Sequence, residues 1–275
     1  MKNMRLISFR NNYIKIIFTI ILGLYCGLLL LTYGQLFRGF HLGNFFPLLV
    51  SDEILFSIGF SLATSLSALL LSFLIGIPSA YILARENFPG KGILESFLYL
   101  PVFLPPLVSG LALVLLVSQG AGGFLESRGI EFMFSSLGVV TAQAFIATPL
   151  AIRSFQTAFQ SVDPKLEQAA ESLGDSPGKV FYEITFPLAW KGILTGLLLA
   201  WARALGEFGA TIMLAGAIRM KTETLPISIY LNMSLGNLEN AIAVGILMLI
   251  IAVVILTIFH YLIGFSSIKN RLPYR

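Results

Sequence analysis

The chain has 275 residues, of which 56% are hydrophobic and only 12% are charged, and its mean hydropathy is +0.86. A soluble domain carries about 25% charged residues, so this composition excludes a water-exposed surface over most of the chain. The formal net charge of +4 then reflects topology and contact with anionic lipid, and it does not indicate nucleic-acid binding. We predict an all-α integral membrane protein.

Six stretches are long and apolar enough to cross a bilayer, for which about 20 residues suffice. Backbone groups in hydrocarbon must satisfy their own hydrogen bonds, so each stretch is predicted as a helix. The predicted spans are 13–33, 54–84, 94–118, 137–159, 188–216 and 240–264. We expect three parts: 1–53 with a cytoplasmic segment, a peripheral first span and an outer loop; 54–264 as one transmembrane domain; and 265–275 as a cytoplasmic tail.

Lysine and arginine are concentrated in one set of segments, which includes both termini and the loop after the fourth predicted span. Cytoplasmic segments carry this excess, so we predict a multi-pass protein of the plasma or inner membrane with both termini inside. The first apolar run is about 20 residues long, too long for the core of a cleaved signal peptide. Cys26 is the only cysteine, which excludes an internal disulfide.

The third predicted span contains three prolines, followed by two small residues: Pro101, Pro105, Pro106, Ser109 and Gly110. Proline removes a backbone donor and kinks or breaks a helix, and irregular backbone in a membrane must face protein or a watery cavity. Broken helices in mid-membrane often mark a transport site. A structural kink between packed helices is the alternative, and the sequence leaves both open. Pro78, in the second span, is interpreted as a kink only.

The fifth predicted span carries small residues at every fourth position: Gly192, Gly196, Ala200 and Ala204. This stripe predicts close helix packing. Arg203 and Glu207 follow, four residues apart, so they can pair. A charge in mid-bilayer costs ~2.5–3.5 kcal/mol on insertion scales. Because Glu207 would repel an anion that Arg203 attracts, we favour a structural or gating ion pair over direct coordination of an anion.

The polar loop 163–187 has the pattern of two short helices. Asp163 and Pro164 are typical of a helix start, and Gly174 is typical of a helix end. Ser176 and Pro177 repeat the start signal, and Pro187 is expected to break the chain before the fifth span. On the first helix, small side chains flanked by carboxylates and an amide suit insertion into a partner's cleft; these residues are Glu167, Gln168, Ala169, Ala170 and Glu171.

The spacing within this loop resembles the EAA loop of the ATP-binding-cassette importer permeases, which reads Glu-Ala-Ala, three residues, Gly, nine residues, Ile-x-Leu-Pro. The corresponding residues here are Gln168-Ala169-Ala170, Gly174 and Ile184-Thr185-Phe186-Pro187. Gln168 replaces Glu and Phe186 replaces Leu, and Glu167 is an alternative source of the carboxylate. The resemblance implies a coupling helix that sits in a groove of a separate ATPase subunit.

The resemblance also implies that ATP and Mg bind to that partner, so this chain would be no enzyme and would hold no cofactor or metal. The segment from Gly174 to Lys179 superficially matches a phosphate-binding loop. It has one residue too few between the glycines, and Val180 stands where Ser or Thr is required.

The fifth span reads Ala-Arg-Ala-Leu-Gly-Glu-Phe-Gly-Ala-Thr from Ala202 to Thr211, which resembles the molybdate and tungstate permeases. The Pro-Pro-Leu-Val-Ser-Gly segment also fits, whereas Gly216-Ala217 stands where those permeases generally have Gly-Asn. The resemblance implies a type I permease bundle that imports an oxyanion. Its candidate pathway or gate residues are Pro105, Pro106, Ser109, Gly110, Arg203, Gly206, Glu207 and Thr211.

The implied partners are an ATPase subunit, a second copy of the chain and an extracytoplasmic oxyanion-binding protein, besides membrane lipid. The binding protein would contact the loops 34–53, 119–136 and 217–239. A sulfate or thiosulfate permease is the alternative within the family. A transporter driven by an ion gradient would need intramembrane acids or histidines, whereas Glu207 is the only acid deep in a span and His260 lies near the end of the sixth span. His41 and His260 lack metal-ligand spacing, which disfavours an intramembrane enzyme.

Overall fold

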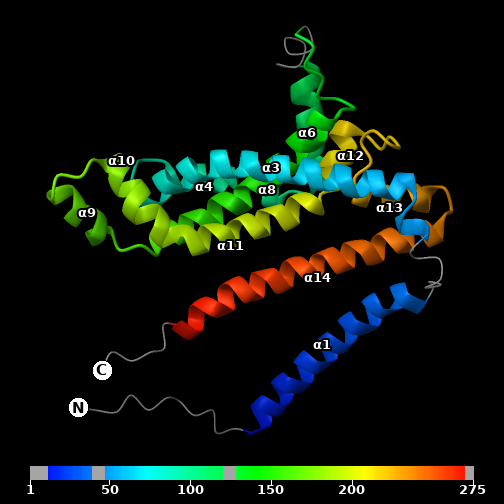
Figure 1. The fold of residues 1–275 in the computed structure, drawn as a ribbon, viewed down its shortest axis with the longest axis horizontal. Coiled ribbons are helices and arrows are strands. Elements are labelled where there is room, and N and C mark those ends of the chain that lie inside the picture. The colour runs from blue at the N-terminus through cyan, green and yellow to red at the C-terminus, as the bar shows by residue number, and fades with distance from the viewer. Residues whose placement is uncertain (1–11, 39–46, 120–127, 270–275) are drawn as a thin grey trace.

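The computed structural model describes residues 12–38, 47–119 and 128–269. The described residues form helices and no strand, as Figure 1 shows. In chain order the helices are α1 (Asn12–Arg38), α3 (Asp52–Arg85), α4 (Lys91–Leu98), α5 (Leu100–Phe103), α6 (Pro106–Gln119), α8 (Ser136–Gln160), α9 (Pro164–Ser172), α10 (Pro177–Val180), the π-helix η1 (Phe181–Thr185), α11 (Phe186–Leu205), α12 (Gly209–Ala215), α13 (Leu225–Ser234) and α14 (Leu238–Lys269).

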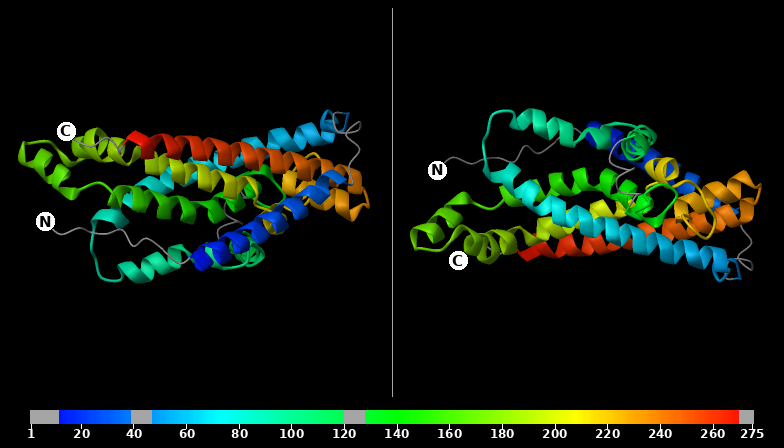
Figure 2. Two further views of the ribbon diagram at one scale, coloured as in Figure 1. Left: turned by 90° about the horizontal axis from the view of Figure 1, so that it is seen from below. Right: turned by 90° about the horizontal axis from the view of Figure 1, so that it is seen from above.

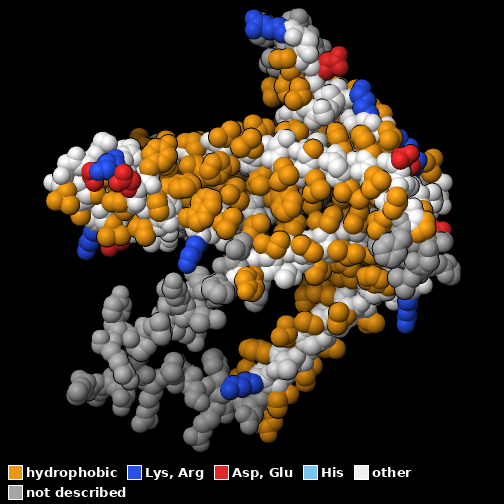
Figure 3. All heavy atoms as spheres, in the orientation of Figure 1, with side chains coloured by type: hydrophobic (Ala, Val, Ile, Leu, Met, Phe, Trp, Pro, Cys, Tyr) orange, Lys and Arg blue, Asp and Glu red, His pale blue; other side chains and the backbone are white. Residues whose placement is uncertain are grey.

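Within the described residues, five helical segments are long and apolar enough to cross a membrane: Tyr13–Arg38, Asp52–Arg85, Ser136–Gln160, Pro177–Leu205 and Leu238–Ile258. The shorter apolar helix α6 belongs to the remaining predicted span. The prediction of an all-helical membrane protein is therefore confirmed. In Figure 3 charged side chains gather at the α9 end of the bundle, at the opposite end and on the projecting segment around α6, and the surface between them is mostly apolar.

The centre of the molecule consists of α3, α8 and α11, which pack along their lengths. Their shared core is rich in alanine and is completed by large aromatic side chains, with Phe155 and Phe159 fully buried. Phe159 and Tyr81 meet edge to face with ring centroids 5.5 Å apart. This core holds the ends of three helices in fixed relation, which matters for the loop that joins α8 to α11.

The glycine stripe of the fifth span packs against α8, as its spacing predicts. A methyl group added at Gly192 would lie 2.5 Å from Ala158 Cβ, and one added at Gly196 would lie 2.6 Å from Ser154 Cβ. Real carbon atoms do not approach this closely, so only glycine permits this distance between the helices. The stripe is therefore a packing surface.

Two predicted spans are interrupted rather than continuous. The span 94–118 divides into α4, α5 and α6, because Leu104 is extended and Pro105 and Pro106 cannot continue the helix before them. The span 188–216 divides into α11 and α12, with Gly206 ending the first part. The prolines predicted the first interruption, and we did not predict the second.

Pro187 does not break the chain, contrary to the expectation. It lies in the first turn of α11, and the preceding turn is the π-helix η1. Phe186 N–H donates to Phe181 C=O, five residues back. This wider turn changes the hydrogen-bonding register just before the residue that lacks a donor, so the helix runs on from the polar loop into the membrane span.

Helix α1 is peripheral, as predicted. None of its most apolar stretch is buried, and it meets the rest of the molecule mainly through α14 near Leu36. In Figure 1 it diverges from the bundle, and in Figure 2 α4 and α14 lie on opposite sides of the central helices. Cys26 is exposed on α1, which fits an apolar residue facing lipid.

We predict that Gly196→Val destabilises the bundle, because the added methyl groups must displace Ser154 and Phe155. Overpacking of this kind costs about 1–3 kcal/mol, and thermal unfolding in detergent would show the lower midpoint. Gly245→Val in α14 is the matched control, since nothing lies within 4 Å of a Cβ there. Equal midpoints for the two variants would contradict the packing described above.

Candidate functional site

The polar loop forms a protruding end of the molecule, led by α9 (Figure 1). The start signals of this helix act as predicted: Asp163 accepts a hydrogen bond from Lys165 N–H at 3.0 Å. At its end Gly174 has φ +98°, a conformation that favours glycine. Gly174 N–H donates to Glu171 C=O and Asp175 N–H donates to Ala170 C=O, which is the Schellman termination. The helix is thus fixed at both ends by its own sequence.

One face of this loop is exposed and combines polar and apolar side chains. Gln168, Ala169 and Glu171 are exposed, whereas Ala170 is buried. Beside them Leu173 is 88% exposed and Tyr182 is 73% exposed. Large apolar side chains exposed among charged ones are typical of surfaces that bind a partner. We call this face, residues 166, 168, 169, 171–174 and 182, the docking face.

Glu167 points away from the docking face and into the molecule. Its Oε1 accepts hydrogen bonds from Arg85 Nε at 3.1 Å, from Arg85 Nη2 at 2.7 Å and from Thr185 Oγ1 at 2.6 Å. Arg85 also donates to Val162 C=O at 3.3 Å. The carboxylate therefore joins the end of α3, the start of α9 and the π-helix η1. We call Arg85, Glu167 and Thr185 the anchor cluster.

The anchor cluster is shielded from water, with 12% of the Arg85 side chain and 11% of the Glu167 side chain exposed. Removing one partner of a buried ion pair costs about 3–5 kcal/mol, because the other charge is left uncompensated. Neither Arg85 nor Thr185 was predicted to contact Glu167. Thr185 was noted only as part of the loop spacing. With Glu167 occupied, Glu171 and the amide of Gln168 are the polar groups that the docking face presents next to Ala169.

The other two predicted loop residues lie where the loop joins the bundle. Ile184 in η1 is half-buried, and Pro187 opens α11 and is exposed. Nearby, Phe181 packs edge to face on Tyr81 with ring centroids 5.0 Å apart. These residues shape the joint, and they are not part of the docking face.

The two interrupted spans pack against each other at their breaks. A methyl group at Gly110 in α6 would lie 2.8 Å from Ala210 Cα, and one at Gly209 in α12 would lie 2.9 Å from Pro106 Cβ. Each broken helix thus presents a glycine to the other. The structure brings Pro106 and Gly110 together with the segment that follows Gly206 and Glu207.

Glu207 is fully engaged at the break between α11 and α12. Its Oε1 accepts a hydrogen bond from Ala210 N–H at 2.8 Å, and its Oε2 pairs with Arg203 Nη1 at 2.6 Å. The Glu207 side chain is 1% exposed and that of Arg203 is 32% exposed. The predicted pairing is present, and the carboxylate also caps the first turn of α12. This arrangement favours the structural role over anion coordination.

A groove with a volume of about 550 Å³ runs between α3, α5, α6 and α8. Its walls are apolar, and its polar atoms are mainly the hydroxyls of Ser79, Ser109, Thr141 and Thr148. Ser109 is buried. The hydroxyl groups of Thr148 and Ser72 share a hydrogen bond, with 3.0 Å between Oγ1 and Oγ. The groove therefore offers scattered neutral donors and no charged group among its lining residues.

Two fully buried polar side chains near the breaks have no hydrogen-bond partner among the described residues. They are Gln143 in α8 and Thr211 in α12. Their sequence neighbours Ala142 and Ala210 share one hydrophobic cluster. Buried polar groups are normally satisfied, so this region has unused donors. Thr211 was among the predicted pathway or gate residues, whereas Gln143 was not. The polar side chain of Gln143 within an otherwise apolar span is the feature of the sequence that could have indicated it.

The residues that the structure describes contain no group of three or more His, Cys, Asp or Glu side chains that could hold a metal ion. Pro105, in the turn before α6, is exposed and its carbonyl accepts from Val108 N–H. It acts on the backbone and carries no chemistry of its own.

The described residues thus form a helical membrane bundle with two broken spans and a protruding polar loop. The chain belongs to the family of binding-protein-dependent transport system inner membrane components, whose model matches residues 72–266.

Similar proteins point the same way. The molybdenum transport system permease protein ModB of Escherichia coli (strain K12) is 43% identical over 212 residues, which cover 75% of this chain and 92% of that protein. A probable sulfate transport system permease protein, cysT, of Chlorokybus atmophyticus is 36% identical over 198 residues, 71% of this chain and 69% of that protein.

The fold is shared with a bacterial alginate ABC transporter that was crystallised in complex with an alginate pentasaccharide-bound periplasmic protein. The TM-score is 0.69 at 21% identity, and the match covers 90% of this chain and 92% of that chain. This likeness supports the fold. The predicted type I bundle is thereby confirmed.

We predict that Glu167→Ala releases α9 from the bundle, because Arg85 and Thr185 lose their common acceptor. Trypsin cleavage after Lys165 and Lys179 should then accelerate by about tenfold or more, given the cost of breaking a buried ion pair. Glu171→Ala removes an exposed carboxylate from the same helix and should leave the rate unchanged. Equal cleavage of both variants and the wild type would contradict the anchor cluster.

Proposed function

We propose that this chain is the transmembrane subunit of an ATP-driven importer that carries molybdate or tungstate from an extracytoplasmic binding protein into the cytoplasm. The observation that carries the proposal is the docking face, exposed at one end of the bundle and fixed to α3 and η1 by Glu167. Of the two relatives compared, the molybdenum permease is the more similar. A sulfate or thiosulfate permease is the alternative.

The docking face would seat in a groove of an ATPase subunit, which binds ATP and Mg. This chain would then catalyse no reaction itself. The start of α1 and the end of α14 lie towards the α9 end of the molecule (Figure 1), which supports placing both termini on the cytoplasmic side with the docking face. A second copy would complete the pathway, and lipid would surround the apolar surface.

The binding protein would dock at the opposite end. Of the three loops expected to contact it, 34–53 and 119–136 include residues 39–46 and 120–127, which lie outside the described part of the chain. The third loop, 217–239, contains α13 and exposes Arg219, Met220 and Lys221. Lys221 adds a positive charge that suits a partner carrying an anion, whereas the charge of Arg219 is paired with Glu53.

Transport would proceed by alternating access. Movement of the ATPase subunits displaces α9, and Glu167 transmits that displacement to α3 through Arg85 and to η1 through Thr185. The broken helices α6 and α12 then repack at Gly110 and Gly209. Neutral donors such as Ser109, Gln143 and Thr211 would hold a dianion weakly, so the ion is released and not trapped.

We predict that Ala169→Arg abolishes ATP-dependent uptake in vesicles that contain the chain, its ATPase and its binding protein, because a long cation cannot enter the ATPase groove. Gly174→Trp should have the same effect by destroying the αL helix end. Asn87→Arg, at an exposed position in the loop between α3 and α4, is the control and should transport normally. Uptake without the ATPase, or normal uptake by both loop variants, would refute the importer proposal.

We predict that the assembled importer takes up molybdate, and that tungstate but not sulfate competes at equal concentration. The reason is that selectivity would reside in the binding protein, while the pathway of this chain is only weakly polar. The measurement is uptake of labelled molybdate with each competitor. Stronger competition by sulfate than by tungstate would favour the sulfate alternative and leave the ATP-driven mechanism intact.

A further inference from the structure

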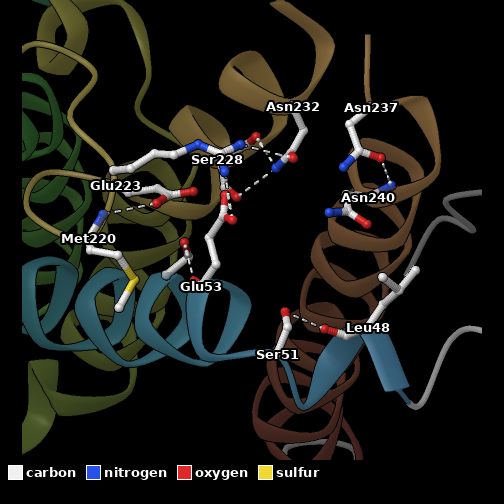
Figure 4. Close-up of polar contacts among 11 residues, drawn as sticks. Leu48, Ser51, Glu53, Met220, Glu223, Ser228, Asn232, Asn237 and Asn240 are labelled. Carbon is white, nitrogen blue, oxygen red and sulfur yellow. Dashed lines mark hydrogen bonds and ion pairs between the residues drawn. The ribbon is translucent and has the colours of Figure 1, made fainter. Parts of the chain in front are cut away.

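Two acidic side chains from distant parts of the sequence meet at the end of the bundle opposite α9. Glu53 lies in the first turn of α3, and Glu223 lies in the loop 216–224 that connects α12 to α13. Figure 4 shows both carboxyl groups directed into the space between the start of α3 and this loop. The proposed transport function assigns no role to either residue.

Arg219 binds one of the two carboxyl groups and ties the cluster to α13. Its Nη1 donates to Glu53 Oε2 at 2.7 Å, and its Nη2 donates to Asn232 Oδ1 at 3.2 Å. Glu223 Oε2 accepts a hydrogen bond from Met220 N–H at 3.1 Å. Each carboxyl group therefore has one oxygen satisfied by a donor from the loop.

The other oxygen of each carboxyl group has no donor among the described residues. The side chains of Glu53 and Glu223 are within hydrogen-bonding reach, yet Glu53 Oε1 and Glu223 Oε1 are buried and receive no donor from the described residues. Glu223 is fully buried. Two ionised carboxylates are acceptors only. A hydrogen bond between the side chains of Glu53 and Glu223 therefore requires that one of them is protonated.

The remaining charges around the pair do not neutralise it. Asp52 next to Glu53 and Lys221 next to Thr222 are both exposed. Helix α13 carries no charged residue, and α14 contributes Glu239 in its first turn. Two carboxyl groups thus share the single guanidinium of Arg219, and like charges this close cannot both be ionised without a large cost.

We propose that Glu53 and Glu223 bind a single proton between them, and that this acid pair, with Arg219, is a proton-dependent lock that holds the loop 216–224 against the start of α3. One proton makes the cluster neutral and supplies the missing hydrogen bond. The loop is also held by bonds that do not titrate: Leu225 N–H donates to Ser61 Oγ at 2.7 Å, and Ile218 N–H donates to Thr222 Oγ1 at 3.1 Å.

The direction of the pH effect follows from linkage. In the open loop both carboxyl groups are solvated and ionised at neutral pH, whereas the closed loop retains one proton. The closed state therefore binds more protons, is favoured as the pH falls, and weakens as the pH rises through the apparent midpoint of the pair. Above that midpoint the opening equilibrium should increase by up to about tenfold per pH unit.

Infrared spectroscopy of the purified chain in detergent tests the proton directly. At about pH 7 we expect the wild type to show one protonated carboxyl band that Glu223→Gln lacks and that Glu131→Gln, an exposed acid elsewhere, retains. Absence of this band in the wild type would overturn the proposal. So would stoichiometric Mn²⁺ binding at the same pH that Glu223→Gln abolishes, since a cation would then occupy the site of the proton.

Hydrogen exchange of residues 216–224 tests the lock. After correction for intrinsic rates, exchange in the wild type should rise between about pH 6 and pH 8.5, whereas Glu223→Gln should stay closed over this range because its amide supplies the hydrogen permanently. Glu53→Ala, which removes the ion pair with Arg219 and leaves no donor at this position for Glu223, should be open throughout. Identical pH dependence in the wild type and Glu223→Gln would overturn the proposal. Neither test measures transport, so failure of the lock proposal can be distinguished from failure of the proposed transport function.

Discussion

The carboxylate of Glu167 is the point at which three segments of the chain meet. Arg85 at the end of α3 and Thr185 in η1 both donate to its Oε1, so α9 cannot shift without moving the helices on either side. A buried ion pair contributes little net stability compared with apolar packing. Its value is geometric, because it fixes how a surface helix is attached to the membrane bundle. This attachment fixes the position of the exposed docking face relative to the central helices.

The charges within the bundle are used for architecture and leave the proposed path nearly neutral. Glu207 is occupied by Arg203 and by the first turn of α12, and the groove beside α6 is lined by apolar groups and hydroxyls. A weakly polar path suits an importer whose selectivity lies in a separate binding protein. At the interruptions of α6 and α12, the glycines Gly110 and Gly209 allow the two segments to approach closely.

Local signals in the sequence predicted local structure well. Asp163, Pro164 and Gly174 delimit α9 as expected, and the four-residue stripe from Gly192 onwards predicted the packing of α11 on α8. Hydropathy predicted the five helical segments that are long enough to cross a membrane and the region of the shorter apolar helix α6. It could not show that the fifth predicted span breaks at Gly206, because hydropathy is the same whether or not the helix is continuous. Pro187 was expected to break the chain, and the π-turn before it is a backbone adjustment that no residue type announces.

The direction of a side chain was harder to predict than its position. Glu167 was a candidate for partner contact because it stands beside the Ala-Ala pair, and its actual partners, Arg85 and Thr185, are 82 and 18 residues away in sequence. Glu53 and Glu223 are likewise far apart in the chain and meet only in the folded bundle. Long-range pairs of this kind depend on the packing of α3 against its neighbours, which periodicity and spacing do not specify.

The central claim is that α9 and the end of α3 move as one body. Spin labels at Glu86 and Lys165, in a Cys26→Ser background and with one doubly labelled chain per assembly, would report the distance between them with and without ATP on the partner subunit. We predict an unchanged distance within the chain. In separate assemblies that carry a single label at Lys165 in each copy of the proposed dimer, the two labels should approach each other. A change within the chain as large as that between the copies would contradict the account.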